Sequence, residues 1–197
     1  MNMVKVGQVY IQARPSAIPA YVILIALCVG VAKRRYPRIG WGAAVMVGIG
    51  WAAMFWASES LHAVGHFLSS RAVDAPLNAI RYEWIFQRTV YYHNGVRPAQ
   101  HFGRAAGGPL ISAFSSLIGM AVWRAVRHVP ILSSIAEAWV FWNMTITLVA
   151  MAPVESLDGG AMLRALRTMR ELKSGQVSVL GRTIVNEPST VMRKHKT

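Results

Sequence analysis

The sequence predicts an all-α polytopic membrane protein with about four transmembrane helices, a three-helix core and a small membrane-associated β-hairpin. Four long runs lack charged residues, the basic residues gather between and after those runs, and one intervening segment is rich in aromatic and β-branched residues. Of the 197 residues 54% are hydrophobic, and the mean hydropathy of +0.35 is high for a soluble protein. Buried helices of a soluble protein are the alternative, which such long uncharged runs disfavour.

The four uncharged runs have the length of membrane spans. A hydrocarbon core of about 30 Å needs roughly 20 apolar helical residues, and the runs contain between 17 and 20 residues. They are Pro15–Ala32, Ile39–Ser58, Ala105–Trp123 and Ala138–Val154. Each run is therefore expected to be one transmembrane helix.

The net charge of +13 predicts an orientation in the membrane. With a cytoplasmic N-terminus, fifteen basic residues lie inside and six outside, and the "KRRYPR" loop (Lys33–Arg38) is the exception to the positive-inside rule. Both termini are then cytoplasmic. We expect a multi-pass protein of the cell (inner) membrane of a prokaryote. The basic tail would contact anionic lipid, so no nucleic-acid partner is expected. The single Cys28 excludes a disulfide within one chain.

The segment between the second and third runs differs from the spans. It favours a β-hairpin or strand pair that begins near Ile80, with Asn94-Gly95 as a turn signal, although its aromatic residues also suit an interfacial belt. A short basic helix is expected from Asp158 to about Lys173. Residues 1–173 form a single predicted domain with a core at about 40–165, and 174–197 are expected to be a partly disordered cytoplasmic tail.

The stretch "SESLHAVGHFLSSR" (Ser58–Arg71) places two histidines four residues apart. His62 and His66 share one helix face, where two imidazoles can hold a zinc ion and leave room for a third ligand and water. Polar groups in a span are costly, so this pair is a functional hypothesis. The expected third ligand is Asp158, which we place in the fourth span at a similar depth, because Gly159 and Gly160 would loosen the helix and let the carboxylate turn.

Three motifs in this order resemble the site-2 protease family of intramembrane zinc metalloproteases. They are "HAVGH", "GGPLIS" (Gly107–Ser112) and "PVESLDGG" (Pro153–Gly160), and the resemblance covers about residues 40–165. It implies that His62, His66 and Asp158 bind Zn²⁺. It also implies that Gly108 and Pro109 of the middle motif, and the hairpin-like loop with Asn94 and Gly95, contact substrate, the loop by pairing with it as an added strand.

Three departures separate the chain from the family pattern. Ala63 stands where the family has its catalytic glutamate, and Ser112 and Ala150 replace frequent asparagines. A glutamate at position 63 would take a proton from water and pass it to the leaving amine, which alanine cannot do. Either Ala63 is an introduced substitution in a native HEVGH, which we favour, or the protein is a natural pseudoprotease. Glu59 is a poor replacement, because it lies about one turn back and would have to reach past His62.

The predicted function is that of an intramembrane zinc endopeptidase that cuts transmembrane segments, here as an inactive variant. The alternatives are a pseudoprotease that captures transmembrane helices without cutting them, and a metal transporter, which the clustering of polar residues at one depth disfavours. The expected partners are a transmembrane protein substrate, the lipid bilayer, and a second copy or a regulatory membrane protein. The other histidines are expected to be solvated, namely His93, His101, His128 and His195.

Overall fold

Five helices and one sheet make up the computed structural model, which describes residues 2–6, 8–92 and 95–174. The helices are α1 (Ala17–Arg35), α2 (Trp41–Ala72), α3 (Pro98–Val126), α4 (Pro130–Ala150) and α5 (Asp158–Lys173). The strands are β1 (Asn2–Val6), β2 (Val9–Ala13), β3 (Ala79–Glu83) and β4 (Phe86–Val90). Most of the predicted tail, residues 175–197, lies outside the described residues.

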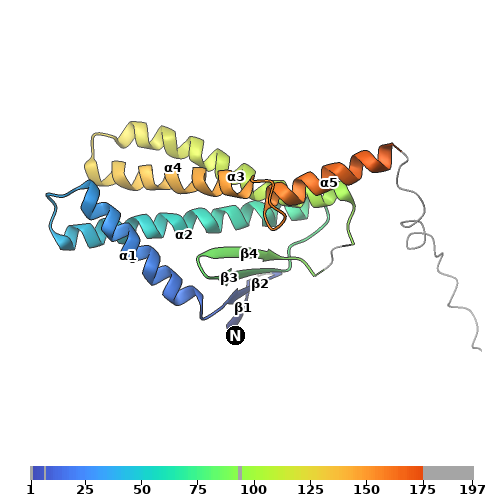
Figure 1. Cartoon of the computed structure of the whole chain (residues 1–197), viewed down its shortest axis with the longest axis horizontal. Coiled ribbons are helices and arrows are strands. Elements are labelled where there is room, and N and C mark those ends of the chain that lie inside the picture. Colours follow the sequence, from blue (N-terminus) through green and yellow to red (C-terminus); the bar gives the residue numbers. More distant parts are fainter. Residues whose placement is uncertain (1, 7, 93–94, 175–197) are drawn as a thin grey trace, which may run out of the picture.

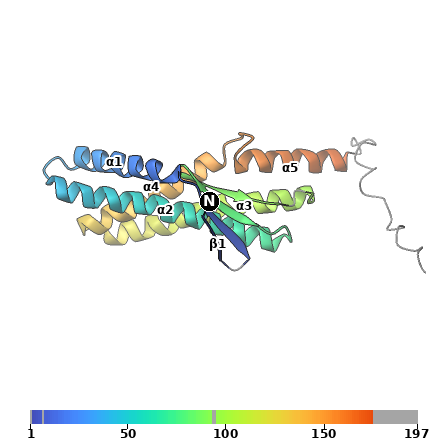
Figure 2. The same ribbon diagram turned by 90° about the horizontal axis from the view of Figure 1, so that it is seen from below.

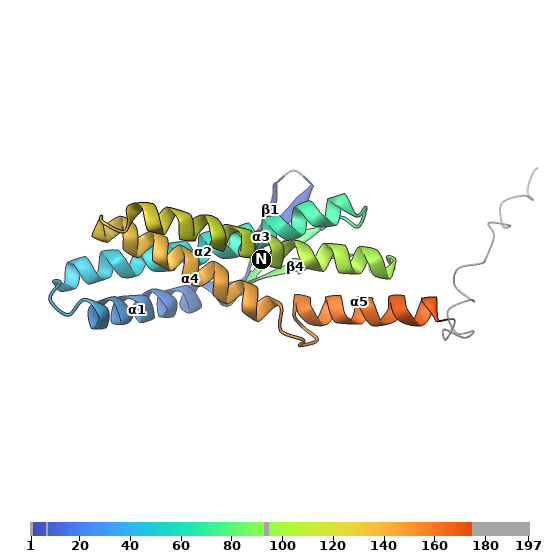
Figure 3. The ribbon, with the colours of Figure 1, turned by 90° about the horizontal axis from the view of Figure 1, so that it is seen from above.

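The four predicted spans are confirmed as helices long and apolar enough to cross a membrane, α1 to α4. These helices lie side by side (Figures 1 and 3). Large apolar side chains are exposed on their outer faces, such as Ile18 and Leu27 of α1 and Leu117 of α3, whereas many of the residues buried between the helices are alanine, glycine or serine. This distribution suits a bundle surrounded by lipid, in which small residues let the helices approach closely.

The second span belongs to a long helix. The helix α2 has 32 residues, from Trp41 to Ala72, and so extends well beyond the uncharged run that ends at Ser58. At 1.5 Å per residue it measures about 48 Å, which exceeds a hydrocarbon core of about 30 Å. His62 and His66 therefore lie in the same uninterrupted helix as the apolar residues of the second span.

The fourth span ends earlier than predicted, at Ala150 rather than Val154, and Asp158 does not lie in it. The helix α4 ends at Ala150, a non-helical turn follows, and Asp158 is the first residue of α5. Pro153 explains the break, because the residue before a proline disfavours helical backbone. Gly159 and Gly160 do not loosen a helix. A Cβ atom on either would collide with backbone carbonyls of Met151 and Val154, so these glycines let α5 begin tight against the turn.

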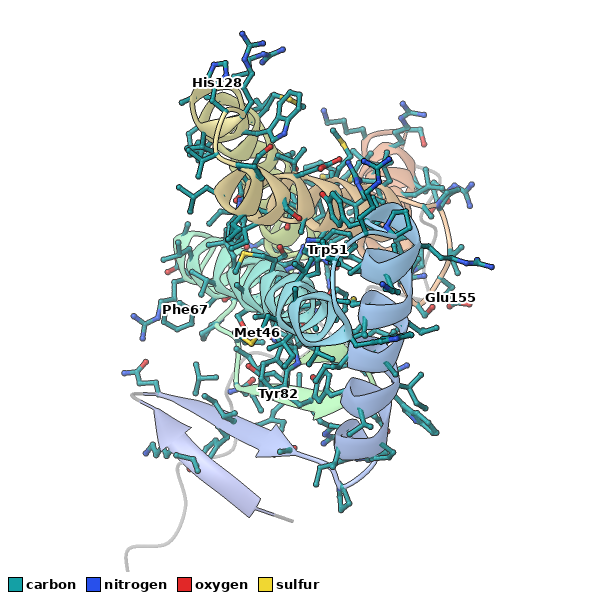
Figure 4. All side chains as sticks on the ribbon, turned by 90° about the vertical axis from the view of Figure 1, so that its left-hand side faces the viewer. Met46, Trp51, Phe67, Tyr82, His128 and Glu155 are labelled. Atoms are coloured by element: carbon teal, nitrogen blue, oxygen red, sulfur yellow. The ribbon has the colours of Figure 1, made fainter. Side chains whose placement is uncertain are left out.

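The connections between helices gather at two ends of the bundle. The α1–α2 and α3–α4 connections lie at one end, and α5 and the α2–α3 connection lie toward the other (Figure 1). Figure 4 looks from the first end and shows His128, in the α3–α4 connection, far from the strands. This agrees with the predicted relative arrangement of the loops. Which end faces the cytoplasm stays a prediction.

The predicted hairpin is part of a larger sheet. The four strands follow the order β1-β2-β3-β4, with β2 and β3 parallel and the other two pairs antiparallel. The sheet lies along α2, on the side away from α4 (Figures 1 and 2). The N-terminal strands were not predicted. Their signal was the alternation of apolar and polar residues around Val4 and in Val9–Ala13.

The turn of the β3–β4 hairpin was predicted at the wrong place. Glu83 pairs with Phe86, so the turn consists of Trp84 and Ile85, and Trp84 has a φ of 55°. A positive φ costs a residue with a Cβ atom roughly 1–2 kcal/mol, so glycine is the residue expected at such a turn position. Tryptophan stands there instead, and the local sequence therefore does not signal this turn. Gly95 instead lies in the exposed loop before α3, and Asn94 lies outside the described residues.

Candidate metal centre

Three of the predicted residues converge on one point between α2 and the start of α5. The Nε2 atoms of His62 and His66 are 3.1 Å apart, and each lies 3.2 Å from Oδ2 of Asp158. The three side chains are largely buried. Among the described residues this is the group of three that could hold a metal ion. His62 and Asp158 are 96 residues apart in the sequence, and the turn between α4 and α5 brings Asp158 next to α2.

The spacing of these atoms fits zinc. In a tetrahedral site with bonds of about 2.0–2.1 Å, neighbouring ligand atoms lie about 3.3 Å apart. The three observed separations of 3.1–3.2 Å are close to that edge length. Two imidazole nitrogens and one carboxylate oxygen are also a ligand set that zinc accepts, and three protein ligands leave a fourth position for water or substrate.

The His66 ring is held in one tautomer. Its Nδ1 lies 2.8 Å from the backbone carbonyl oxygen of Arg104. Because a carbonyl can only accept, Nδ1 carries the hydrogen and donates it. In the neutral ring Nε2 is then the nitrogen with a free lone pair, and it faces His62 and Asp158. Hydrogen bonding of the second ring nitrogen to a carbonyl is how metal-bound histidines are usually oriented.

The His62 ring has a matching partner in Ser112. Its Nδ1 lies 3.0 Å from the Ser112 hydroxyl oxygen, and Ser112 is fully buried. A hydroxyl oxygen can accept the Nδ1 hydrogen, which leaves Nε2 free for a metal. In the sequence Ser112 appeared only as a departure from a frequent asparagine. The structure places it against a predicted metal ligand.

Close packing of α2 on α3 brings these partners together. A Cβ atom on Gly65 would collide with the backbone oxygen of Gly107, and one on Gly107 would collide with the Gly65 oxygen and the Ser69 hydroxyl. Small residues at such a crossing let two backbones approach closely. The same approach sets the Arg104 carbonyl and Ser112 against the histidine rings.

The glycine and proline of the middle motif lie beside the site. A Cβ atom on Gly108 would lie 2.5 Å from Nε2 of His62 and even closer to Nε2 of His66, so only glycine leaves room for both rings. Pro109 is buried within α3. Gly108 thus borders the two predicted metal-binding histidines, and a contact of Gly108 or Pro109 with substrate stays a prediction.

Position 63, where the family has its base, and Glu59, the alternative carboxylate, occupy different surroundings. Ala63 is buried, 3% exposed, in the turn of α2 that holds His62 and His66, and its methyl group cannot accept a proton. Glu59 is buried as well, but its carboxylate accepts a hydrogen bond from the backbone N–H of Gln87 in β4. The Glu59 carboxylate is thus directed to the strand.

A cluster that the sequence did not indicate borders the site. The Arg104 guanidinium stacks 4.0 Å from the Tyr91 ring centroid and donates to Nδ1 of His101 over 2.8 Å. His101, expected to be solvated in a loop, instead lies in α3. Burial raises the pKa of Tyr91 to about 12, although Arg104 opposes the shift. The missed signal was the spacing of His101 and Arg104 one turn apart.

The site opens into a cavity of about 620 Å³ that is lined by Asp158, His66, Thr89, Tyr91 and Arg104, among others. Burial raises the pKa of Asp158, but the two histidine rings beside it outweigh burial and lower it to about 2. Asp158 is therefore a carboxylate at neutral pH, which is the form that binds a cation.

Comparisons with known proteins identify the fold. No protein-family model and no curated protein sequence matches the chain. Among solved structures, the chain is similar to the site-2 protease from Methanocaldococcus jannaschii, with a TM-score of 0.56 and 16% sequence identity over 90% of this chain and 77% of that chain. The four apolar helices and this likeness indicate a multi-pass membrane protein. The chain has a site-2-protease-like fold.

Proposed function

We propose that the protein is an intramembrane zinc endopeptidase in architecture, which binds one Zn²⁺ and captures transmembrane segments of other proteins. The observation that carries the proposal is the convergence of Nε2 of His62, Nε2 of His66 and Oδ2 of Asp158 at mutual distances of 3.1–3.2 Å. The similarity to a solved site-2 protease supports the same function.

The chain's own residues prepare the site for peptide hydrolysis. Arg104 and Ser112 orient the two imidazoles, and Gly108 leaves space beside their Nε2 atoms. When bound, zinc would supply Lewis-acid polarisation and would make water more acidic. A helical substrate hides its carbonyls in hydrogen bonds, so the scissile segment must be extended. The β4 strand at the edge of the sheet offers a partner for such a segment.

The residue at position 63 decides whether the protein cuts. General acid–base catalysis typically contributes about 10²–10⁴-fold to the rate, and the methyl group of Ala63 contributes no proton transfer. With Ala63 in place, the chain therefore holds zinc and captures an extended segment with little or no hydrolysis. A natural capture protein of this kind is the second candidate function, and Ala63 is the observation that favours it.

Metal analysis tests the site. The purified chain should contain one zinc per protomer, and His66→Ala should lose it, because His66 is 3% exposed and contributes a converging nitrogen. The control is His128→Ala at the far end of the bundle. Full zinc in His66→Ala would refute the assignment of the site.

Restoring the base tests the chemistry. Ala63→Glu should cut reporter membrane proteins whose single transmembrane segment contains helix-destabilising glycine and asparagine, in a gel assay in which the unchanged chain leaves them intact. Ala63→Glu combined with Asp158→Ala should be inactive, since a predicted ligand is lost. If Ala63→Glu fails to cut a reporter that cross-links to the protein, the capture function replaces the protease.

A further inference from the structure

A second polar link joins the sheet to the helix that holds the histidines. The backbone N–H of Gln87 donates to Oε2 of Glu59 over 3.3 Å, and the Gln87 side-chain amide donates to the Ser60 hydroxyl over 3.1 Å. Glu59 is only 7% exposed although it carries a carboxylate. These contacts fasten β4 to α2 about one turn before His62. We call Glu59, Ser60 and Gln87 the β4 latch.

The latch occupies the free edge of the sheet. β4 is the last strand in the order, and Gln87 pairs with Tyr82 of β3. In an antiparallel pair, alternate residues direct their N–H and C=O groups toward the partner strand or away from it. Because the Gln87 N–H donates to Glu59, it faces away from β3, and Thr89 two residues later has the same orientation. An added strand would pair at these outward positions, and Glu59 already occupies the donor of Gln87.

Residues of the latch and their neighbours line two cavities. One, of about 600 Å³, is mostly apolar and is lined by Tyr21 of α1, Trp56 and Ser60 of α2, and Tyr82 of β3. Figure 4 shows Tyr82 on the side of α2 that faces the strands. The other is the cavity at the metal centre, which Thr89 lines from β4. Gln87 pairs with Tyr82, which lines the first cavity, and lies two residues before Thr89, which lines the second.

We propose that the β4 latch is a gate that an extended peptide segment must open to pass from the bilayer, along the edge of β4, to the metal centre. The peptide would replace Glu59 as the acceptor of the Gln87 N–H and would continue the pairing at Thr89. The gate rests on the proposed function, since it assigns the route by which a transmembrane substrate reaches the same site. A closed latch keeps lipid and helical segments out of the polar cavity.

Hydrogen exchange tests the latch itself. In bilayer nanodiscs, the peptide that contains Gln87 should exchange several-fold faster in Glu59→Met than in the unchanged chain, because the hydrogen bond from the Gln87 N–H to Glu59 is lost. Ser134→Ala is the matched control, since it removes a partly buried hydrogen bond of 2.9 Å between α2 and α4, from Trp51 to Ser134. Equal exchange in Glu59→Met and Ser134→Ala would overturn the latch.

Cysteine labelling tests the gate without requiring a substrate. A single cysteine at Thr89, in a Cys28→Ser background, is exposed to a small water-soluble maleimide or to a maleimide attached to a lipid acyl chain. Water-soluble labelling should be equal with and without Glu59→Met, whereas lipid-borne labelling should rise several-fold in Glu59→Met. Equal lipid-borne labelling with an intact and a broken latch would overturn the gate.

Ser60→Ala is a milder second variant, which keeps the experiment decisive if Glu59→Met does not fold. It should raise lipid-borne labelling by an intermediate factor, and no rise would count against the gate. Neither measurement depends on zinc or on hydrolysis. If the chain binds no zinc, the proposed function is refuted but the labelling result still stands. If the chain binds zinc but lipid-borne labelling does not rise, the gate is refuted and the proposed function stands.

Discussion

Replacing Ser112 by alanine should weaken zinc binding without removing any metal ligand. The Ser112 hydroxyl lies 3.0 Å from Nδ1 of His62, whereas Nε2 of the same ring faces His66 and Asp158. Ser112 is fully buried. In Ser112→Ala the Nδ1–H group would be buried without an acceptor. The ring would rotate, or would change tautomer and carry its hydrogen on Nε2, where the metal should bind.

The magnitude follows from the cost of that unsatisfied group. An unpaired buried donor costs about 1–3 kcal/mol, and about 1.4 kcal/mol corresponds to a factor of ten in a dissociation constant. The zinc Kd should therefore rise by about 5–150-fold. This range agrees with the loss of about 10–100-fold in metal affinity that is typical when the hydrogen-bond partner of a metal-binding side chain is removed. We expect Ser112→Ala to raise the zinc Kd about 10–100-fold. Ser112→Cys, with a weaker acceptor, should fall in between.

Competition with a chelating dye measures this directly. The control is Ser116→Ala, one turn further along α3. Ser116 is also buried, but its hydroxyl donates to the backbone oxygen of Ser112 over 3.0 Å and not to a histidine. Its zinc Kd should stay within about threefold of the unchanged chain, equivalent to about 0.7 kcal/mol, because the lost hydroxyl contact involves no histidine. If Ser112→Ala behaves like Ser116→Ala, the orienting role of Ser112 is refuted.

Two further predictions concern the space at the site and the orientation in the membrane. Gly108→Ala should lose most bound zinc in elemental analysis, because the new Cβ atom meets both histidine rings, while Gly30→Ala, where a Cβ atom meets nothing within 4 Å, should retain it. Cysteines at Arg35 and Lys173, in a Cys28-free background, should be labelled by an impermeant thiol reagent in intact cells at Arg35 but not at Lys173. Labelling at Lys173 alone would place both termini outside.

Local sequence determined the helices and the residue types at the site. Long uncharged runs have no stable alternative to helices in a bilayer, because each backbone group must be satisfied within its own segment. Helical periodicity alone placed His62 and His66 on one face. Asp158 was identified from its expected depth and then from a motif, and its position in the fourth span was predicted wrongly, because α4 ends at Ala150, before Pro153.

Only the tertiary structure decided the contacts between segments far apart in the chain. The pairing of β2 with β3 joins residues about 70 positions apart, and the turn at Trp84 is imposed by that sheet against local preference. The orientation of His62 by Ser112 and the fastening of Gln87 to Glu59 likewise depend on how closely α3 and β4 pack on α2. Such contacts arise from packing geometry, whereas sequence patterns report mainly local backbone preference and burial.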